Sequence, residues 1–171
     1  FLHGFPECWY SWRHQVSEFS DRYRCIILEM PGYCNYHTTH TEFYRPGRIA
    51  DEVMNALTAL DIAEFVLVGH DWGGMIAYHI AAEYSQRVSK LIIMDCPHPV
   101  KMIDNISFEQ TKRSLYFLLF QMPLLPELYF KLNHCEFVAT ILNMGRNSQS
   151  YLTEDDISIL KWKFSQGATA S

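Results

Sequence analysis

Residues 69–73, Gly-His-Asp-Trp-Gly, have the pattern of a tight turn that presents a nucleophile. The turn follows residues 65–68, a continuous β-favouring run, and precedes an apolar stretch with helical spacing that starts after Gly73. Glycines flank the central residue because a Cβ at either position would collide with neighbouring backbone. The pattern predicts a strained strand-to-helix turn, here called the elbow, that holds the Asp71 carboxylate at the carboxyl end of a sheet.

A carboxylate nucleophile implies displacement chemistry rather than simple ester hydrolysis. Asp71 would attack an sp³ carbon and form an alkyl ester, which requires no prior removal of a proton from the nucleophile. Water would then cleave the ester at the Asp71 carbonyl, and the resulting oxyanion needs preorganised donors. The alternatives are a turn without a chemical role and a phosphate-binding loop, although no lysine follows Gly73 and Gly74.

Candidate oxyanion donors come from residues 3–6, His-Gly-Phe-Pro, which directly follow a predicted strand end at residues 1–2. The backbone N–H groups of Phe5 and Trp72 are the predicted donors, and Pro6 is expected to follow a cis peptide bond. The side chains of Phe5 and Trp72 are expected to line an apolar substrate site.

The histidines near these motifs are not predicted to be catalytic. His3 lies at a turn and is expected to be a structural histidine, and His70 points away from Asp71 because side chains alternate along a strand. Cys96 and His98 stand alone, without the spacing of a metal site. Neither a metal nor another cofactor is predicted.

The composition is that of a globular protein. The chain has 171 residues, 49% of them hydrophobic, and a formal net charge of -5. Because no basic face is present, a small molecule is a better expected partner than nucleic acid. The cysteines, 5 in number, are scattered, which predicts reduced thiols and an intracellular setting. The longest apolar stretch, residues 115–125, is too short to span a bilayer, so no membrane segment is predicted in the chain.

Buried β-type runs alternate with helical patterns over residues 1–99, which predicts an α/β fold with a mostly parallel sheet and flanking helices. The predicted strands lie at residues 1–2, 24–28, 65–68 and 91–94, and the predicted helices at residues 9–19, 49–60 and from 73 onward.

After residue 99 the pattern changes, because no β-type run recurs. Ser107-x-x-Gln110 and Thr153-x-x-Asp156 have the pattern of capping boxes at helix starts. Residues 100–171, here called the cap, are therefore predicted to be a partial helical layer packed on the sheet.

The motifs together resemble the epoxide hydrolase branch of the α/β-hydrolase family, particularly its membrane-anchored animal members. The resemblance rests on residues 3–7 (His-Gly-Phe-Pro-Glu), 9–12 (Trp-Tyr-Ser-Trp), 69–74 and 97–99 (Pro-His-Pro). It implies an incomplete α/β-hydrolase core at residues 1–99 with the cap at residues 100–171. It also implies a small apolar epoxide as substrate, which Asp71 opens to an ester that is later hydrolysed to a diol.

The resemblance also implies a role for a cap tyrosine. In the family, a cap tyrosine a few residues before Phe-Gln donates a hydrogen bond to the epoxide oxygen, and Tyr116 precedes Phe120 and Gln121. Tyr116 is thus the predicted donor and a predicted substrate contact, and the alternative for it is a core aromatic. For the intact protein the resemblance implies a membrane anchor, as in the endoplasmic reticulum, through a segment outside this chain.

The chain departs from the family pattern in two places. Residues 29–34 read Glu-Met-Pro-Gly-Tyr-Cys where the family has Asp-x-Arg-Gly-x-Gly, which affects the packing of that loop. The second cap tyrosine, the catalytic histidine and its carboxylate partner are expected beyond residue 171, because His98 comes too early to be that base. We therefore expect a fragment that is inactive alone. A haloalkane or haloacid dehalogenase with the same aspartate, and a non-catalytic binding fragment, remain open alternatives.

Overall fold

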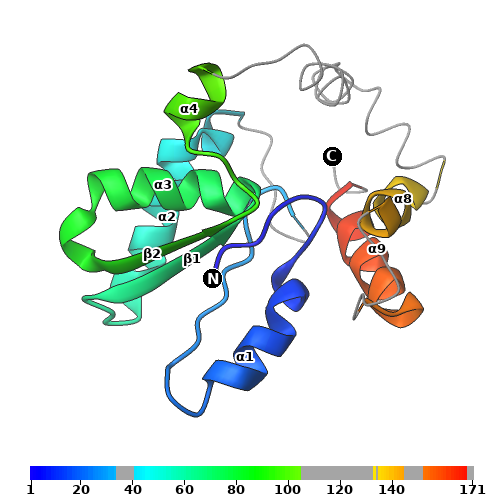
Figure 1. Ribbon diagram of the computed structural model, residues 1–171, viewed down its shortest axis with the longest axis horizontal. Coiled ribbons are helices and arrows are strands. Elements are labelled where there is room, and N and C mark those ends of the chain that lie inside the picture. The colour runs from blue at the N-terminus through cyan, green and yellow to red at the C-terminus, as the bar shows by residue number, and fades with distance from the viewer. Residues whose placement is uncertain (34–40, 105–132, 134, 145–151, 169–171) are drawn as a thin grey trace.

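The computed structural model describes residues 1–33, 41–104, 133, 135–144 and 152–168. Its two named strands, β1 (Phe65–His70) and β2 (Val88–Met94), are parallel neighbours in one sheet. Figure 1 shows them side by side, with helix α3 (Trp72–Glu83) running next to them. The strands predicted at residues 65–68 and 91–94 and the helix predicted after Gly73 are thereby confirmed.

Leu2 adds one residue to this sheet on the other side of β1. It forms parallel bridges with Gly69 and with Leu28. Its N–H donates to the Val68 carbonyl at 2.9 Å, and its own carbonyl accepts from the His70 N–H at 3.1 Å. The strand predicted at residues 24–28 is reduced to the single bridge at Leu28. The Leu28 N–H also donates to the Phe1 carbonyl at 3.2 Å, and the Phe1 amino group donates to the Ile26 carbonyl at 2.8 Å.

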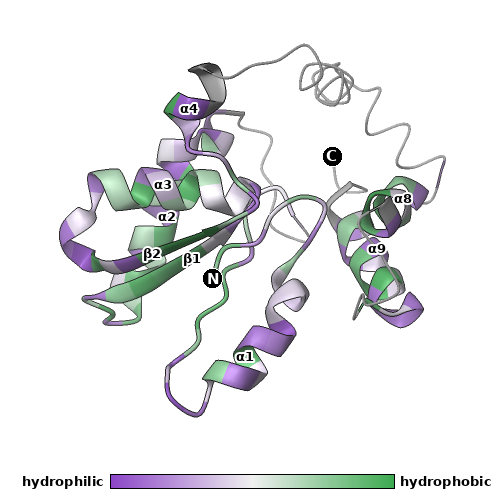
Figure 2. Ribbon diagram, viewed as in Figure 1, coloured by the Kyte–Doolittle hydropathy of each residue, from purple (hydrophilic) through white to green (hydrophobic). Residues whose placement is uncertain are grey.

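The core lies between the sheet and two helices, α2 (Pro46–Ala59) and α3. Proline at the first position of α2 costs no hydrogen bond, since an N–H there has no helical partner. Figure 2 shows apolar residues along the strands and on the helices beside them. The buried members of this core cluster are Leu2, Met30, Ile49, Ala50, Val53, Met54, Leu57, Leu67, Ile76, Ala77 and Ile80.

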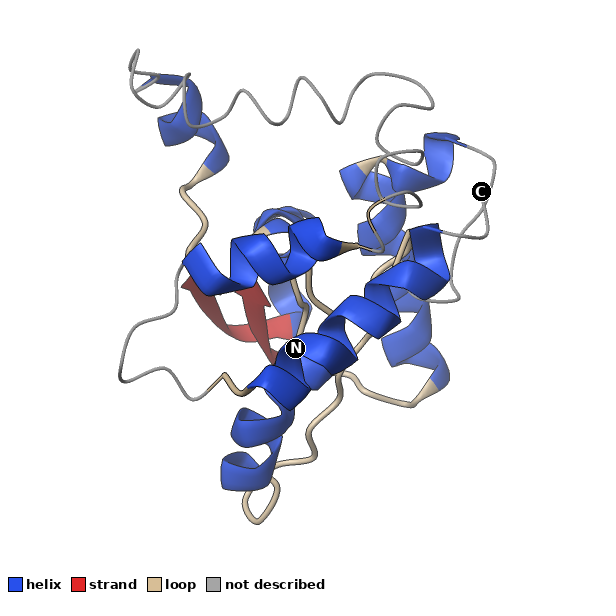
Figure 3. Ribbon diagram, turned by 90° about the vertical axis from the view of Figure 1, so that its right-hand side faces the viewer, coloured by secondary structure: helices blue, strands red, loops and turns tan. Residues whose placement is uncertain are grey.

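The helix predicted at residues 9–19 forms as a 3-10 turn, η1 (Trp9–Trp12), that continues into α1 (Arg13–Phe19). Short 3-10 turns also precede α2, as η2 (Thr41–Tyr44), and β2, as η3 (Ser85–Arg87). Figure 3 shows the two strands lying next to each other with helices around them.

The loop that departs from the family pattern packs into the core. Met30 is buried, and its N–H donates to Nε2 of His3 at 3.0 Å. Gly32 adopts a φ of 90°, a conformation that glycine accepts without the steric cost of a Cβ. The loop therefore keeps a tight turn despite its unusual residues, while Cys34 lies outside the described residues.

The described part of the cap is helical, as predicted. It contains α4 (Pro99–Asp104), α8 (Glu136–Met144) and α9 (Glu154–Ala168). The capping box at the start of α9 forms in both directions: the Thr153 N–H donates to Asp156 Oδ2 at 2.9 Å, and the Asp156 N–H donates to Thr153 Oγ1 at 3.1 Å. The pair Ser107 and Gln110 lies outside the described residues. Within the described ranges, no helix is long and apolar enough to cross a membrane.

Candidate active site

The elbow holds Asp71 in a strained conformation between β1 and α3. Its φ of 51° and ψ of -121° lie in a region that residues with a Cβ rarely adopt. The Asp71 N–H donates to the Met94 carbonyl at 3.1 Å, and the Asp71 carbonyl accepts from the Gly74 N–H at 2.9 Å. These bonds tie the turn to β2 and to the first turn of α3, so the carboxylate is presented at the end of the sheet as predicted.

The elbow glycines are required by close backbone packing. A Cβ on Gly73 would lie 2.6 Å from the His3 carbonyl oxygen, and a Cβ on Gly69 would lie 2.6 Å from the Gly73 carbonyl oxygen. Neither distance is compatible with a side chain, because both obstacles are backbone atoms of buried residues. The steric reason predicted for both glycines is confirmed.

The segment after Leu2 brings a backbone donor to the nucleophile. The Phe5 N–H donates to Asp71 Oδ1 at 2.8 Å, and the Phe5–Pro6 peptide bond is cis, as predicted. The close approach depends on Gly4, since a Cβ there would lie 2.5 Å from the Asp71 Cβ. Sequence reasoning assigned no role to Gly4, although a glycine directly before a predicted donor was a signal for a close backbone approach.

His3 is a buried structural histidine, as expected. Its Nδ1 lies 3.0 Å from the Gly4 carbonyl oxygen. Its Nε2 lies 3.0 Å from the Met30 nitrogen and 2.8 Å from Glu29 Oε1. The ring of Tyr33 meets the His3 ring edge-on at 4.8 Å between centroids. His3 therefore fixes the loop that carries Phe5.

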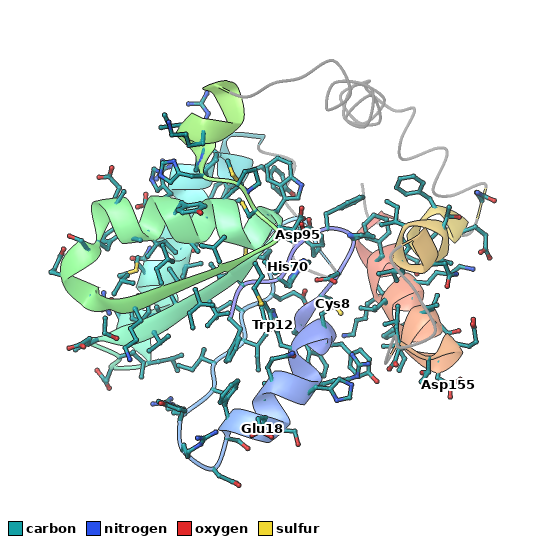
Figure 4. All side chains as sticks on the ribbon, viewed as in Figure 1. Cys8, Trp12, Glu18, His70, Asp95 and Asp155 are labelled. Carbon is teal, nitrogen blue, oxygen red and sulfur yellow. The ribbon has the colours of Figure 1, made fainter. Side chains whose placement is uncertain are left out.

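Acidic groups gather around the elbow. The Nδ1 atom of His70 lies 3.1 Å from Glu7 Oε2, so its ring is directed at Glu7. Figure 4 places His70 and Asp95 near each other, at the carboxyl ends of the neighbouring strands. Burial raises the pKa of the Cys96 thiol, and the charges of Asp71 and Asp95 raise it further. The site thus has a negative field, which disfavours phosphate.

The Glu7 hydrogen bond raises the pKa of His70 above its ordinary value, although burial opposes this shift. The stabilisation from the pair is fully present below the unfolded pKa of roughly 6.5 and is lost as pH rises through the higher folded pKa. We expect Glu7→Gln to lower the pKa of His70, measured by an NMR titration of its ring. Glu18→Gln, at an exposed carboxylate on α1, is the control. An unchanged pKa in Glu7→Gln would contradict the role of this pair.

The other two predicted site residues are Trp72 and Tyr116. Trp72 begins α3 directly after the nucleophile, with 44% of its surface exposed. The exposed His98 packs on Tyr78 of α3 at 4.9 Å between ring centroids. Tyr116 lies outside the described residues, so its role stays a prediction. Among the described cysteines, Cys8, Cys25 and Cys96 form no disulfide.

Metal chemistry was not predicted for this chain. Within the residues that the structure describes, no group of three or more His, Cys, Asp or Glu side chains could hold a metal ion.

The cap reaches the candidate site through the side chain of Phe5. The Phe164 ring of α9 meets the Phe5 ring edge-on at 5.5 Å between centroids. Both rings pack on a buried cluster formed by Cys135 and Val138. Sequence reasoning missed Phe164, because contacts between residues so far apart in sequence leave no local pattern.

Comparisons with known proteins agree with this geometry. A family model described as alpha/beta hydrolase fold matches residues 1–167. Epoxide hydrolase 4 of Mus musculus is 37% identical over 178 aligned residues, which cover 99% of this chain and 49% of that protein. Epoxide hydrolase 4 of Homo sapiens is 36% identical, with the same coverage of both chains.

A solved structure shows the same likeness. The Bacillus megaterium epoxide hydrolase in complex with an inhibitor superposes with a TM-score of 0.87 at 28% identity, over 98% of this chain and 60% of that one. The chain spans about half the length of the curated relatives it matches, since it covers 49% of each.

Proposed function

Because this chain belongs to the alpha/beta hydrolase fold family, we propose that it carries the nucleophile-bearing part of an epoxide hydrolase, with Asp71 as the nucleophile. The observation that carries the proposal is the 2.8 Å hydrogen bond from the Phe5 N–H to Oδ1 of a carboxylate held at a φ of 51°. The similarity to proteins named epoxide hydrolases supports an epoxide as the substrate class.

Ring opening needs a free carboxylate oxygen and an acid. Oδ1 of Asp71 is engaged by the Phe5 N–H, which leaves Oδ2 to attack an epoxide carbon. The new C–O bond forms as the ring C–O bond breaks, and its electron pair stays on the departing oxygen. We assign the proton for that oxygen to the Tyr116 hydroxyl, as the family resemblance implies.

Ester hydrolysis uses the Phe5 N–H in a second role, as an oxyanion donor. Water adds to the Asp71 carbonyl carbon, and negative charge develops on the oxygen that the Phe5 N–H already contacts. The Trp72 N–H, which follows the nucleophile directly, is the proposed second donor. As the ester C–O bond breaks, one proton of the water goes to the leaving oxygen and the other returns to the Tyr116 phenolate, so the diol leaves and the Asp71 carboxylate is restored. The base that activates this water is not assigned to a residue of this chain.

An isotope experiment tests this sequence of steps. The protein, expressed at its full length and in excess over an aryl epoxide, reacts once in water enriched in oxygen-18. The new hydroxyl of the diol is expected to carry unlabelled oxygen, because that atom comes from Asp71, while the label enters the protein. A labelled diol in the first turnover would show direct attack by water and refute the proposal. Halide release from a chloroalkane without diol formation would favour the dehalogenase alternative.

We expect Tyr116→Phe to slow ring opening by roughly 10²-fold or more while leaving ester hydrolysis unchanged, since its hydroxyl acts only as the epoxide oxygen departs. Single-turnover measurement of ester formation on Asp71, followed by intact mass, reports the first step alone. Tyr23→Phe, at an exposed tyrosine after α1, is the matched control. An unchanged rate of ester formation in Tyr116→Phe would assign Tyr116 to the core instead.

A further inference from the structure

One face of α9 contacts the segment that follows the proposed oxyanion donor. Asp156, Leu160 and Phe164 are spaced four residues apart, which places them on the same side of the helix, and together they are here called the α9 stripe. Figure 1 shows α9 lying beside the N-terminal part of the chain. The stripe thus joins the cap to the core at a site remote from the chain connection at residue 99.

The first member of the stripe is an ionic anchor. The Tyr10 hydroxyl donates to Asp156 Oδ1 at 2.9 Å, and Arg13 Nη2 lies 2.9 Å from Asp156 Oδ2. The Thr153 hydroxyl also donates to Oδ2 at 2.9 Å. Only 6% of the Asp156 surface is exposed, and the Arg13 guanidinium lies over the Tyr10 ring at 4.4 Å. A buried carboxylate with this many donors holds a fixed position.

The protonation state of Asp156 agrees with this arrangement. Burial alone would raise the pKa of Asp156, but the hydrogen bonds from Thr153 and Tyr10 and the charge of Arg13 outweigh it and hold the pKa below its usual range. The carboxylate is therefore ionised at neutral pH, as a strong acceptor must be.

The rest of the stripe is apolar and leads to the donor itself. Leu160 packs with the buried Cys8, and burial raises the pKa of that thiol to about 11, so it packs as a small neutral side chain. Phe164 packs on the Phe5 ring at 5.5 Å. The side chain of Phe5 thus packs against cap residues, while its N–H donates to Asp71 Oδ1 at 2.8 Å.

We propose that the α9 stripe positions the oxyanion donor: the Asp156 anchor on Tyr10 and Arg13 seats Phe164 on Phe5 and so holds the Phe5 N–H at the nucleophile. Asp156 and Phe164 are then positioning residues that act through Phe5. The catalytic part of this inference rests on the proposed function, in which the Phe5 N–H stabilises the oxyanion of ester hydrolysis.

The inference predicts which reaction step depends on the stripe. Ring opening develops no oxyanion on Oδ1, so it should not require an exactly placed Phe5 N–H, whereas ester hydrolysis should. When the stripe is broken, the ester on Asp71 should accumulate. In steady state, kcat and KM then fall together, and the single-turnover rate of ester formation stays the same. A general loss of stability would not produce this split.

The test uses Asp156→Asn and Phe164→Ala in the full-length protein. With selective nitrogen-15 labelling of phenylalanine, we expect the Phe5 amide to exchange with solvent roughly tenfold faster or more in both variants. The Phe65 amide in β1 should keep its exchange rate. With an aryl epoxide, the rate of ester hydrolysis should fall roughly tenfold or more, at an unchanged rate of ester formation.

Two matched controls separate the anchor from its surroundings. Asp155→Asn removes the neighbouring, exposed carboxylate of the same helix turn, which Figure 4 shows on α9. Glu136→Gln breaks the ion pair between Lys161 of α9 and Glu136 of α8, which fastens α9 within the cap and not to the core. Both controls should leave Phe5 exchange and ester hydrolysis unchanged.

The possible outcomes are distinct. Unchanged Phe5 exchange in Asp156→Asn and Phe164→Ala overturns the inference, whether or not the protein acts on epoxides. If the unaltered protein forms no ester on Asp71, the proposed function fails, and Phe5 exchange still decides whether the stripe positions the donor. If the β1 amides also exchange faster in Asp156→Asn, the milder variant Tyr10→Phe, which removes one hydroxyl only, replaces it in the test. Faster Phe5 exchange in that variant at intact β1 protection supports the inference, and no change overturns it.

Discussion

Asp71→Ala is expected to abolish diol formation, with a loss of roughly 10⁴-fold or more. Without the carboxylate no ester forms, and the Phe5 N–H that contacts Oδ1 loses its partner. The variant should show no mass adduct after incubation with a reactive aryl epoxide, whereas the unaltered protein should show one on Asp71 in a quenched single turnover. Diol formation by chromatography gives the second measurement.

A matched control separates loss of the nucleophile from loss of stability. Asp61 has a φ of 56°, close to the 51° of Asp71, but lies after α2 and away from the elbow. Asp61→Ala therefore replaces an aspartate at a positive φ without removing a proposed catalytic group. It should retain diol formation in proportion to its folded fraction. Near-normal turnover by Asp71→Ala would show that the nucleophile is another residue.

Gly4→Ala is expected to slow ester hydrolysis by roughly 10²- to 10³-fold, the cost of losing one oxyanion donor. The added Cβ would lie 2.5 Å from the Asp71 Cβ and 2.6 Å from Oδ1, so the loop and the nucleophile must move apart. The Phe5 N–H moves with Gly4 and loses its hydrogen bond. The ester on Asp71 should accumulate in the variant, which intact mass detects during turnover.

Gly47→Ala provides the comparison for this substitution. Gly47 lies in the first turn of α2, where a Cβ would meet only the His79 ring, at 3.3 Å from Nε2. A ring at the end of a side chain can shift by a few tenths of an ångström, so ester hydrolysis should stay at the level of the unaltered protein. Equal rates in Gly4→Ala and the unaltered protein would mean that the Phe5 N–H is not an oxyanion donor.

The parts of the site that could be predicted from sequence are those with a local cause. The elbow combines a β-favouring run, two glycines and a helical stretch, and each of these acts over a few residues. The cis bond before Pro6 and the capping box of Thr153 and Asp156 are local in the same sense. The strand predicted at residues 24–28 is reduced to one bridge, because a ladder also depends on a partner segment that a local pattern does not identify.

The parts that sequence reasoning missed depend on contacts between distant residues. The bond from Tyr10 to Asp156 joins positions 146 residues apart, and Asp156 had been assigned only its local role as a capping residue. Phe5 was expected to line a substrate site, whereas its ring also packs on Phe164 of α9. Periodicity predicts that α9 has a face to bury, but it cannot identify the surface that receives this face.

The attachment of α9 to residues 5–13 has a consequence for recombining these proteins. A chimaera that exchanged the cap as one continuous segment would take residues 100–171. That unit would leave behind Phe5, Cys8, Tyr10 and Arg13, the residues on which α9 rests. A graft that carries residues 5–13 together with the cap keeps both halves of the contact. The set of residues that must be exchanged together is thus discontinuous in sequence, and part of it lies before the nucleophile.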